Sequence, residues 1–135
     1  MYETEQDLAD LQALLDRSYA TAGQHLRSIF SPQRRMSAAE LVQLLRGVFV
    51  LNVATVSAAC TPVVAPVDGL FYRGKLLFGF PPGAVRARHA RERPQVSAVH
   101  HRGEEHCVIV HGQAREIDLE APDGREFLDY FQEVY

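Results

Sequence analysis

The sequence contains no tryptophan, a single lysine and only two cysteines among its 135 residues. Two cysteines, Cys60 and Cys107, are too few for a disulfide framework, so a reduced, cytoplasmic protein is the simplest expectation. The longest apolar run, at 48–56, is interrupted by Asn52 and is much shorter than a membrane span. The N-terminus has no basic stretch followed by an apolar one, so we expect neither a secretory signal nor a membrane partner.

Glycine-rich phosphate loops are also missing: neither a GxGxxG motif nor a P-loop occurs. What remains is ordinary globular composition, with 47% hydrophobic and 23% charged residues and a net charge of −3. The length predicts one compact unit. We expect residues 1–47 to form a helical segment that packs on a barrel or a dimer interface, and residues 48–135 to form the barrel domain.

Helical patterns dominate the first part of the chain. Apolar residues recur at steps of three and four through the first 30 residues, which predicts one helix there. Ser37 and Glu40 have capping-box spacing, so a second helix should begin at Ser37 and stop near Gly47. A short Ala/Arg-rich helix at 84–92 and a last helix from about 122 complete the expected set.

Strand patterns occupy the rest, at 48–57, 62–72, 75–80, 95–101 and 106–119. Arg73-Gly74 forms a tight hairpin turn, and Gly112 is expected to mark a bulge. Pro62 and Pro66 disfavour a central position for the second strand or else mark bulges. The short connections predict an α+β fold, mainly β, with an antiparallel sheet that curls toward a barrel. Two helices precede this sheet, and the Arg-rich helix lies between its third and fourth strands.

The segment 84–94 carries four arginines against one glutamate in an acidic chain. At about 100° per residue, Arg86, His89 and Arg93 share one helix face, and Arg88 and Arg91 share another. A helix that starts directly after a strand and a loop offers free amides to an anion, and Arg86 in its first turn could bind the same anion. A solvated basic face is the structural alternative. We expect no nucleic-acid binding, because aromatic residues do not alternate with the basic ones.

Histidines and a cysteine gather around the hairpin predicted at "RGEE". With this turn, His101 faces His106 and His100 faces Cys107 across the strands. Strand alternation puts Cys107 and His111 on one face and His106 on the other. A zinc site needs three or four converging ligands, and this pattern offers at most two per face, so no metal site is expected.

The segment 51–118 resembles the pyridoxamine 5′-phosphate oxidase-like, FMN-binding split-barrel superfamily. The matching pattern is an ordered series of short pieces over about half the chain. In order they are "ATVS" (54–57), a turn followed by Pro62, a strand with Pro66, "FGF" (78–80), a basic helix ending in "RERP" (91–94), "VSAV" (96–99) and "VHGQA" (110–114).

This resemblance implies a split β-barrel that dimerises with FMN at the interface, or with a deazaflavin or haem on the same scaffold. It implies a flavin-type oxidoreductase that transfers a hydride to or from a small organic substrate. The alternative is a non-catalytic cofactor- or haem-binding split barrel. The cofactor-binding positions implied by the match are Thr55, Gly79, Phe80, Pro81, Arg86, Arg88 and Cys107; no catalytic residue is implied. Ala65 and Leu70 stand where true pyridoxamine phosphate oxidases have Arg and Lys, so vitamin B6 oxidation is not implied.

Overall fold

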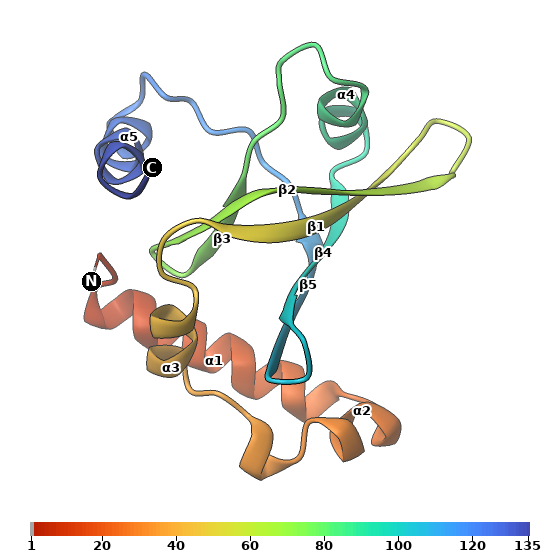
Figure 1. The fold of residues 1–135 in the computed structure, drawn as a ribbon, viewed down its shortest axis with the longest axis vertical. Helices are drawn as coiled ribbons and strands as arrows, with labels where there is room; N and C mark the ends of the chain where they lie inside the picture. The colour runs from red at the N-terminus through yellow and green to blue at the C-terminus, as the bar shows by residue number, and fades with distance from the viewer. Residues whose placement is uncertain (1) are drawn as a thin grey trace. The chain divides into compact units, whose positions relative to one another are not determined.

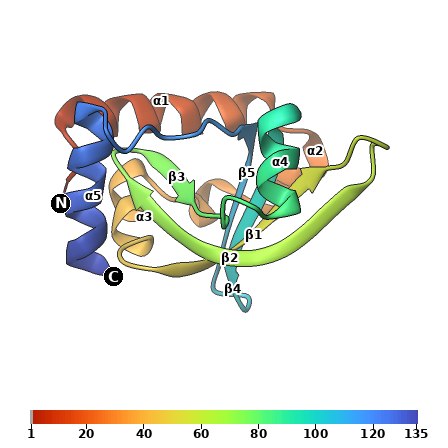
Figure 2. The ribbon, with the colours of Figure 1, turned by 90° about the horizontal axis from the view of Figure 1, so that it is seen from above.

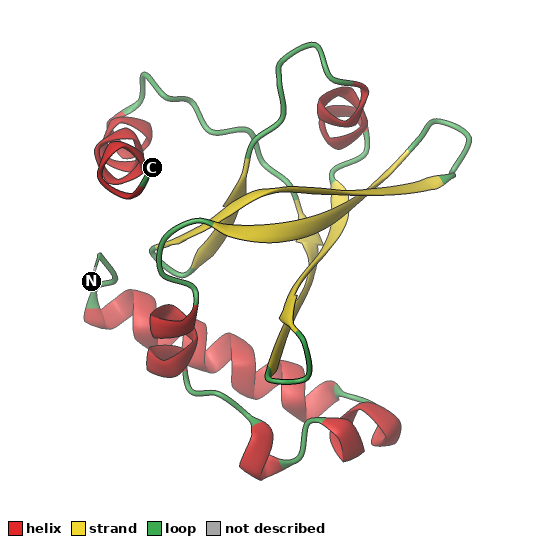
Figure 3. Cartoon of the chain, viewed as in Figure 1, coloured by secondary structure: helices red, strands yellow, loops and turns green. Residues whose placement is uncertain are grey.

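Residues 2–135 are described by a computed structural model, in which they form an α+β fold with five α-helices and a five-stranded sheet (Figure 1 and Figure 3). The chain divides into two units. The first consists of Met1–Arg46 with Phe71–Leu76, and the second of Gly47–Leu70 with Leu77–Tyr135. No helix in the described part of the chain is long and apolar enough to cross a membrane.

Helices make up most of the first unit. They are α1 (Glu5–Thr21), α2 (Gln24–Ile29), the 3-10 helix η1 (Pro32–Arg34) and α3 (Ala38–Leu44). The prediction of one continuous helix through the first 30 residues is therefore wrong. Ala22 and Gly23 adopt extended backbone conformations, which end α1 and start α2. The N-terminal segment thus has three α-helices instead of the expected two.

Two capping boxes fix helix starts in this unit. The predicted one is confirmed: the Ser37 hydroxyl accepts from the Glu40 amide, and the Glu40 carboxylate accepts from the Ser37 amide at 2.7 Å. The second, at the start of α1, was not predicted. There Asp7 accepts from the Thr4 amide at 2.9 Å and also from the Arg73 guanidinium at 3.1 Å.

These contacts predict how acid affects stability. The Thr4 backbone hydrogen bond, and then Arg73, lower the pKa of Asp7 below its ordinary value, while partial burial opposes this shift. A carboxylate whose pKa is lower in the folded state stabilises the fold at any pH above its pKa in the unfolded state. This stabilisation is lost as the pH falls through its pKa in the folded state. We expect Asp7→Asn to destabilise the protein at pH 7. We also expect the stability of this variant to fall less steeply than that of the wild type as the pH drops below about 4. Thermal melts between pH 2 and 7 measure this.

The exposed Asp129 on α5 (Pro122–Val134) provides the matched control, because it lacks these contacts. The melting temperature of Asp129→Asn should depend on pH in the same way as that of the wild type. If the wild type and Asp7→Asn lose stability equally as the pH falls, the acid sensitivity does not come from Asp7.

The sheet has the strand order β3-β2-β1-β4-β5 (Figure 2). Its strands are β1 (Phe49–Val56), β2 (Pro62–Tyr72), β3 (Lys75–Phe78), β4 (Gln95–Arg102) and β5 (His106–Gln113). β1 pairs antiparallel with both β2 and β4, and β4 pairs antiparallel with β5. Arg73 and Gly74 both have positive φ, 48° and 77°, as the predicted two-residue hairpin turn requires.

One face of β1 forms the core of the second unit. Leu51, Val53 and Thr55 alternate with more exposed neighbours and are at most 1% exposed. Ala98 of β4 lies opposite Val53 and is also buried. Helix α4 (Val85–Glu92), which follows β3 and precedes β4, packs against β1.

Two local predictions for the strands are corrected, and a third is resolved. Gly112 pairs with Val96 in an unbroken register, so it marks no bulge. β5 ends at Gln113 and not at 119, because its partner β4 begins at Gln95. Beyond it, the Ala114 amide still donates to the Pro94 carbonyl at 2.7 Å. Pro62 and Pro66 are paired with β1 without a bulge. The four-residue β3 follows a two-residue turn and reaches only the C-terminal end of β2, so both prolines lie on an uncovered edge, in line with the expectation that they avoid a central position.

Candidate functional site

Helix α4 has an anchored face and a free face, as its spacing predicted. Arg86, His89 and Arg93 all contact the sheet. The Arg93 Nε donates to the Val56 carbonyl at 2.7 Å, and His89 Nδ1 lies 3.4 Å from the Thr55 hydroxyl. A purely solvated basic face is therefore excluded for this side of the helix.

Arg86 is held from two directions. Its NH1 donates to the Ala65 carbonyl of β2 at 3.1 Å, and its guanidinium carbon lies 4.6 Å above the centre of the Phe80 ring. Phe80 is itself packed edge-on against Phe78 at the end of β3, with ring centres 5.4 Å apart. The guanidinium is thus positioned by cation–π and hydrogen-bond contacts, and most of its five N–H donors remain available.

The start of α4 lies beside this arginine in the chain. Its N-cap, Ala84, supplies no side-chain acceptor, so the first helical amides, those of Val85 and Arg86, have no cap partner. The preceding loop is closed by a hydrogen bond from the Ala84 amide to the Pro81 carbonyl at 2.9 Å. Added side-chain carbons at Gly79 and Gly83 would meet nothing within 4 Å, so the backbone there is open to approach. Unpaired amides, the positive helix end and a fixed guanidinium together suit a phosphate or another anion.

Thr55 and His89 form a buried polar pair beneath α4. Thr55 is 0% exposed and His89 is 7% exposed. Thr55, an expected cofactor position, therefore supports α4 from below and does not line an open surface. The burial of His89 was not predicted, although its spacing from Arg86 and Arg93 placed it on the anchored face.

Two other expected cofactor residues lie away from Arg86. Arg88 is exposed on the free face of α4, and its guanidinium has no hydrogen-bond or ion-pair partner among residues 2–135. Cys107 is a half-buried free thiol on β5, opposite His101. The strand registers put Cys107 on the opposite face of the sheet from Thr55. The structure thus brings together Phe80 and Arg86, with Gly79 and Pro81 next to them in the chain, and leaves Arg88 and Cys107 apart.

Arg91, the neighbour of Arg88 on the free face, makes an exposed ion pair. It donates from two nitrogens to the Glu116 carboxylate, at 3.0 and 3.3 Å. This hydrogen-bonded pair lowers the pKa of Glu116 and raises that of Arg91. Both groups are solvated, so the pair contributes little to stability.

The sheet face that carries Cys107 has several exposed apolar side chains. Val50 is 57%, Val64 65% and Ile109 48% exposed, and the registers place all three on this face. Half-exposed Ala54 and Val99 lie between them on the same face. Asn52 and Ser97 lie on the same face, so it combines exposed apolar side chains with polar ones, as interaction faces do.

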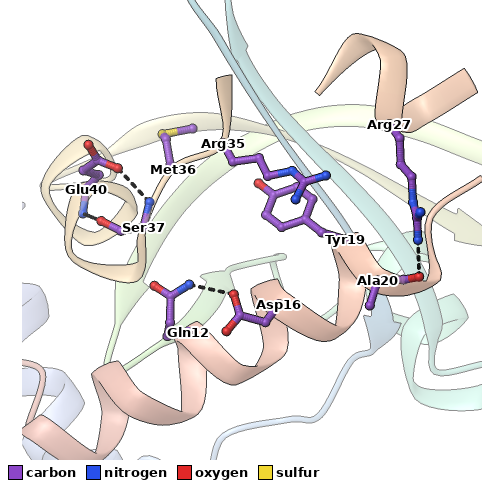
Figure 4. A pocket seen from close by; sticks show the side chains of 9 residues that line it. All are labelled: Gln12, Asp16, Tyr19, Ala20, Arg27, Arg35, Met36, Ser37 and Glu40. Carbon is purple, nitrogen blue, oxygen red and sulfur yellow. Dashed lines mark hydrogen bonds between the residues drawn. The ribbon is translucent and has the colours of Figure 1, made fainter. Parts of the chain in front are cut away.

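A cleft of about 560 Å³ lies within the first unit (Figure 4). Its polar groups largely satisfy one another: Gln12 donates to Asp16 at 3.0 Å, and Arg35 lies over the ring of Tyr19 at 4.3 Å. It carries no grouping with a recognisable chemistry. Its lining residues are Gln12, Asp16, Tyr19, Ala20, Arg27, Arg35, Met36, Ser37 and Glu40.

Compared with known proteins, the chain matches no protein-family model and no curated protein sequence.

Proposed function

We propose that this chain is a flavin-type oxidoreductase, using FMN or a deazaflavin, of the pyridoxamine 5′-phosphate oxidase-like split-barrel superfamily. Its substrate would be a small organic molecule that gains or loses a hydride. The observation that carries this proposal is the anion site at the start of α4, where Arg86 is fixed on Ala65 and Phe80 beside two uncapped amides. A cofactor phosphate is the anion that this site suits.

The architecture supports the proposal. An antiparallel five-stranded sheet, with a basic helix inserted between β3 and β4, is the order of elements that the family resemblance implies. β2 is a long, curved strand, as Figure 2 shows, and its curvature suits a sheet closing toward a split barrel. The two cysteines are free thiols, which suits the cytoplasmic location that we propose.

The side chains at the start of α4 fit an anchored cofactor. Arg86 and the first amides of α4 would hold its phosphate, while Gly79 and Pro81 leave the neighbouring backbone accessible. Bound flavin would supply the hydride chemistry itself. The described residues at this site bind and orient; none is placed as a general acid or base.

A second copy of the chain would complete the site. The sheet face around Val64, with its exposed apolar side chains, is the surface that we propose a partner covers, forming a homodimer. Cys107 lies on this same face, so it would approach a cofactor only across the dimer interface.

The proposal predicts that Arg86→Ala weakens FMN binding severalfold, because the substitution removes the positioned guanidinium. Purified protein should show flavin or deazaflavin absorption, or should gain it on titration with FMN. Fluorescence quenching of FMN measures the dissociation constant for the wild type and the variant.

Arg88→Ala is the matched control, because it removes the same charge from an exposed side chain on the free face of the same helix, whereas Arg91 also donates to the Pro82 carbonyl of the neighbouring loop at 3.5 Å. It should bind FMN as the wild type does. Equal affinity of Arg86→Ala and the wild type would refute the phosphate site. A colourless protein that binds neither FMN nor a deazaflavin would refute the function, and a Soret band would replace it with haem binding.

A further inference from the structure

Two histidines meet on the core face of the sheet, at its β4–β5 hairpin. His100 pairs across the strands with Val108, so His106, two residues before Val108 on β5, lies on the same face. The two Nε2 atoms are 3.2 Å apart, and the ring centres are 5.2 Å apart. This pairing differs from the predicted one: the turn is one residue shorter, so His101 faces Cys107 and His106 faces Arg102.

His100 is already oriented as a metal ligand would be. Its Nδ1 lies 2.8 Å from the Val50 carbonyl, which can only accept, so Nδ1 carries the proton. The Nε2 of the neutral ring therefore presents its lone pair toward His106. The ring is also packed against Phe49, with ring centres 4.8 Å apart. A backbone carbonyl that fixes the tautomer through the other ring nitrogen is the usual support of a metal-binding histidine.

The spacing of the two nitrogens fits a shared ion. Nitrogens bound to one tetrahedral zinc ion at about 2.0–2.1 Å lie about 3.3–3.4 Å apart. The observed 3.2 Å needs only a small adjustment to match. The geometry points to a zinc-binding site formed by His100 Nε2 and His106 Nε2, a site separate from the anion site at α4.

The chain supplies only some of the ligands that this ion needs. No group of three or more His, Cys, Asp or Glu side chains within residues 2–135 could hold a metal. The chain therefore supplies two ligands, and water or an external ligand fills the remaining positions. Zinc is preferred to magnesium or calcium, because imidazole ligands suit zinc and the latter ions prefer oxygen.

Without metal, the same two rings share one hydrogen bond, which His106 Nε2–H donates to His100 Nε2. Zinc binding moves the His106 proton to its Nδ1, and both rings remain neutral. Arg102, opposite His106, places a positive charge on this face, but Glu105 pairs with it at 3.4 Å and both side chains are largely exposed. Solvent therefore screens the repulsion that Arg102 exerts on the ion.

The other histidines of the hairpin serve as internal controls. His101 is the next residue on β4, is exposed, and points to the opposite face. His111 lies on that opposite face too and is hydrogen-bonded to Ser97 at 2.7 Å. Neither can join His100 and His106 without a change in strand register.

Calorimetric titration of Zn²⁺ into the metal-stripped full chain tests the proposal. We expect one zinc per chain and an affinity lowered about tenfold or more by His106→Gln or by His100→Asn. The control variant, His101→Asn, should bind within about twofold of the wild type, because it removes a neighbouring imidazole from the opposite face. Circular dichroism shows which variants are folded, and the two ligand variants give independent tests.

Nitrogen-15 NMR of the histidine rings adds a second readout. Zinc should shift Nε2 of both His100 and His106 and leave His101 unchanged. Absence of stoichiometric binding, wild-type affinity in a folded His106→Gln or His100→Asn variant, or an equal loss in His101→Asn would each overturn the proposal.

Discussion

Replacing Leu51 with alanine is expected to lower the free energy of unfolding by about 2–5 kcal/mol. Leu51 is 1% exposed on β1, in the row of buried side chains that includes Val53 and Thr55. The substitution removes apolar atoms from a strand that is paired on both edges. The sheet cannot collapse onto the cavity, because the neighbours of β1 are fixed in register. Urea denaturation followed by circular dichroism measures the loss.

Leu14→Ala is the control for this prediction. It makes the same chemical change at a side chain that is 50% exposed on α1, where alanine also favours helix. We expect a change within about 0.5 kcal/mol for that variant. An equal cost for the two variants would show that Leu51 is not part of a packed core.

The second large effect concerns the opposite face of the same sheet. Under the proposed homodimer, Val64→Asp should convert the dimer to monomer at micromolar concentration. Val64 is 65% exposed on this face, so aspartate is tolerated in the monomer but is buried without a partner at an interface. Light scattering coupled to size-exclusion chromatography measures the mass of each species.

Leu119→Asp introduces the same charge at another exposed apolar residue, in the segment between β5 and α5 and outside the strands. It should leave the dimer intact. A monomeric wild type, or a Val64→Asp variant that remains dimeric, would contradict a dimer formed through this face. Flavin binding by Arg86→Ala is a separate measurement, so the two parts of the proposal can fail independently.

Local signals in the sequence predicted much of the fold. The 100° spacing assigned Arg86, His89 and Arg93 to one face of α4, and the structure confirms that all three contact the sheet. The capping box at Ser37 and the turn at Arg73-Gly74 are also confirmed. These features depend on residues close in sequence, whose geometry is set by backbone sterics and local hydrogen bonds.

The errors arose where a distant partner decides the structure. The end of β5 depends on where β4 begins, a pairing that no residue between 114 and 119 encodes. The histidine register depended on the length of one turn: Gly103, with φ of 50°, starts a three-residue turn and Arg102 stays in the strand. A shift of one residue exchanges the faces of a strand, so this single error put His101 beside His106 in place of His100.

At the candidate site, too, local features could be predicted and contacts between distant residues could not. Arg86 could be placed at the start of a helix from its neighbours in the chain. The burial of Thr55 under His89 could not be predicted from the sequence, because both side chains are polar and only the packing of α4 on β1 covers them. The contact of Arg86 with Phe80 likewise joins a loop to a helix, and sequence spacing does not specify it.

The two prolines of β2 have a consequence for how this protein behaves at high concentration. β3 has four residues and follows a two-residue turn, so it can cover only the C-terminal end of the eleven-residue β2. The rest of that edge is open, and an open edge invites other chains to add strands and aggregate. Pro62 and Pro66 lie four residues apart in an unbroken ladder with β1, so their missing N–H groups fall on the same, outer edge. An incoming strand would find two of its expected donors absent there, and β2 is thereby protected from seeding fibrils.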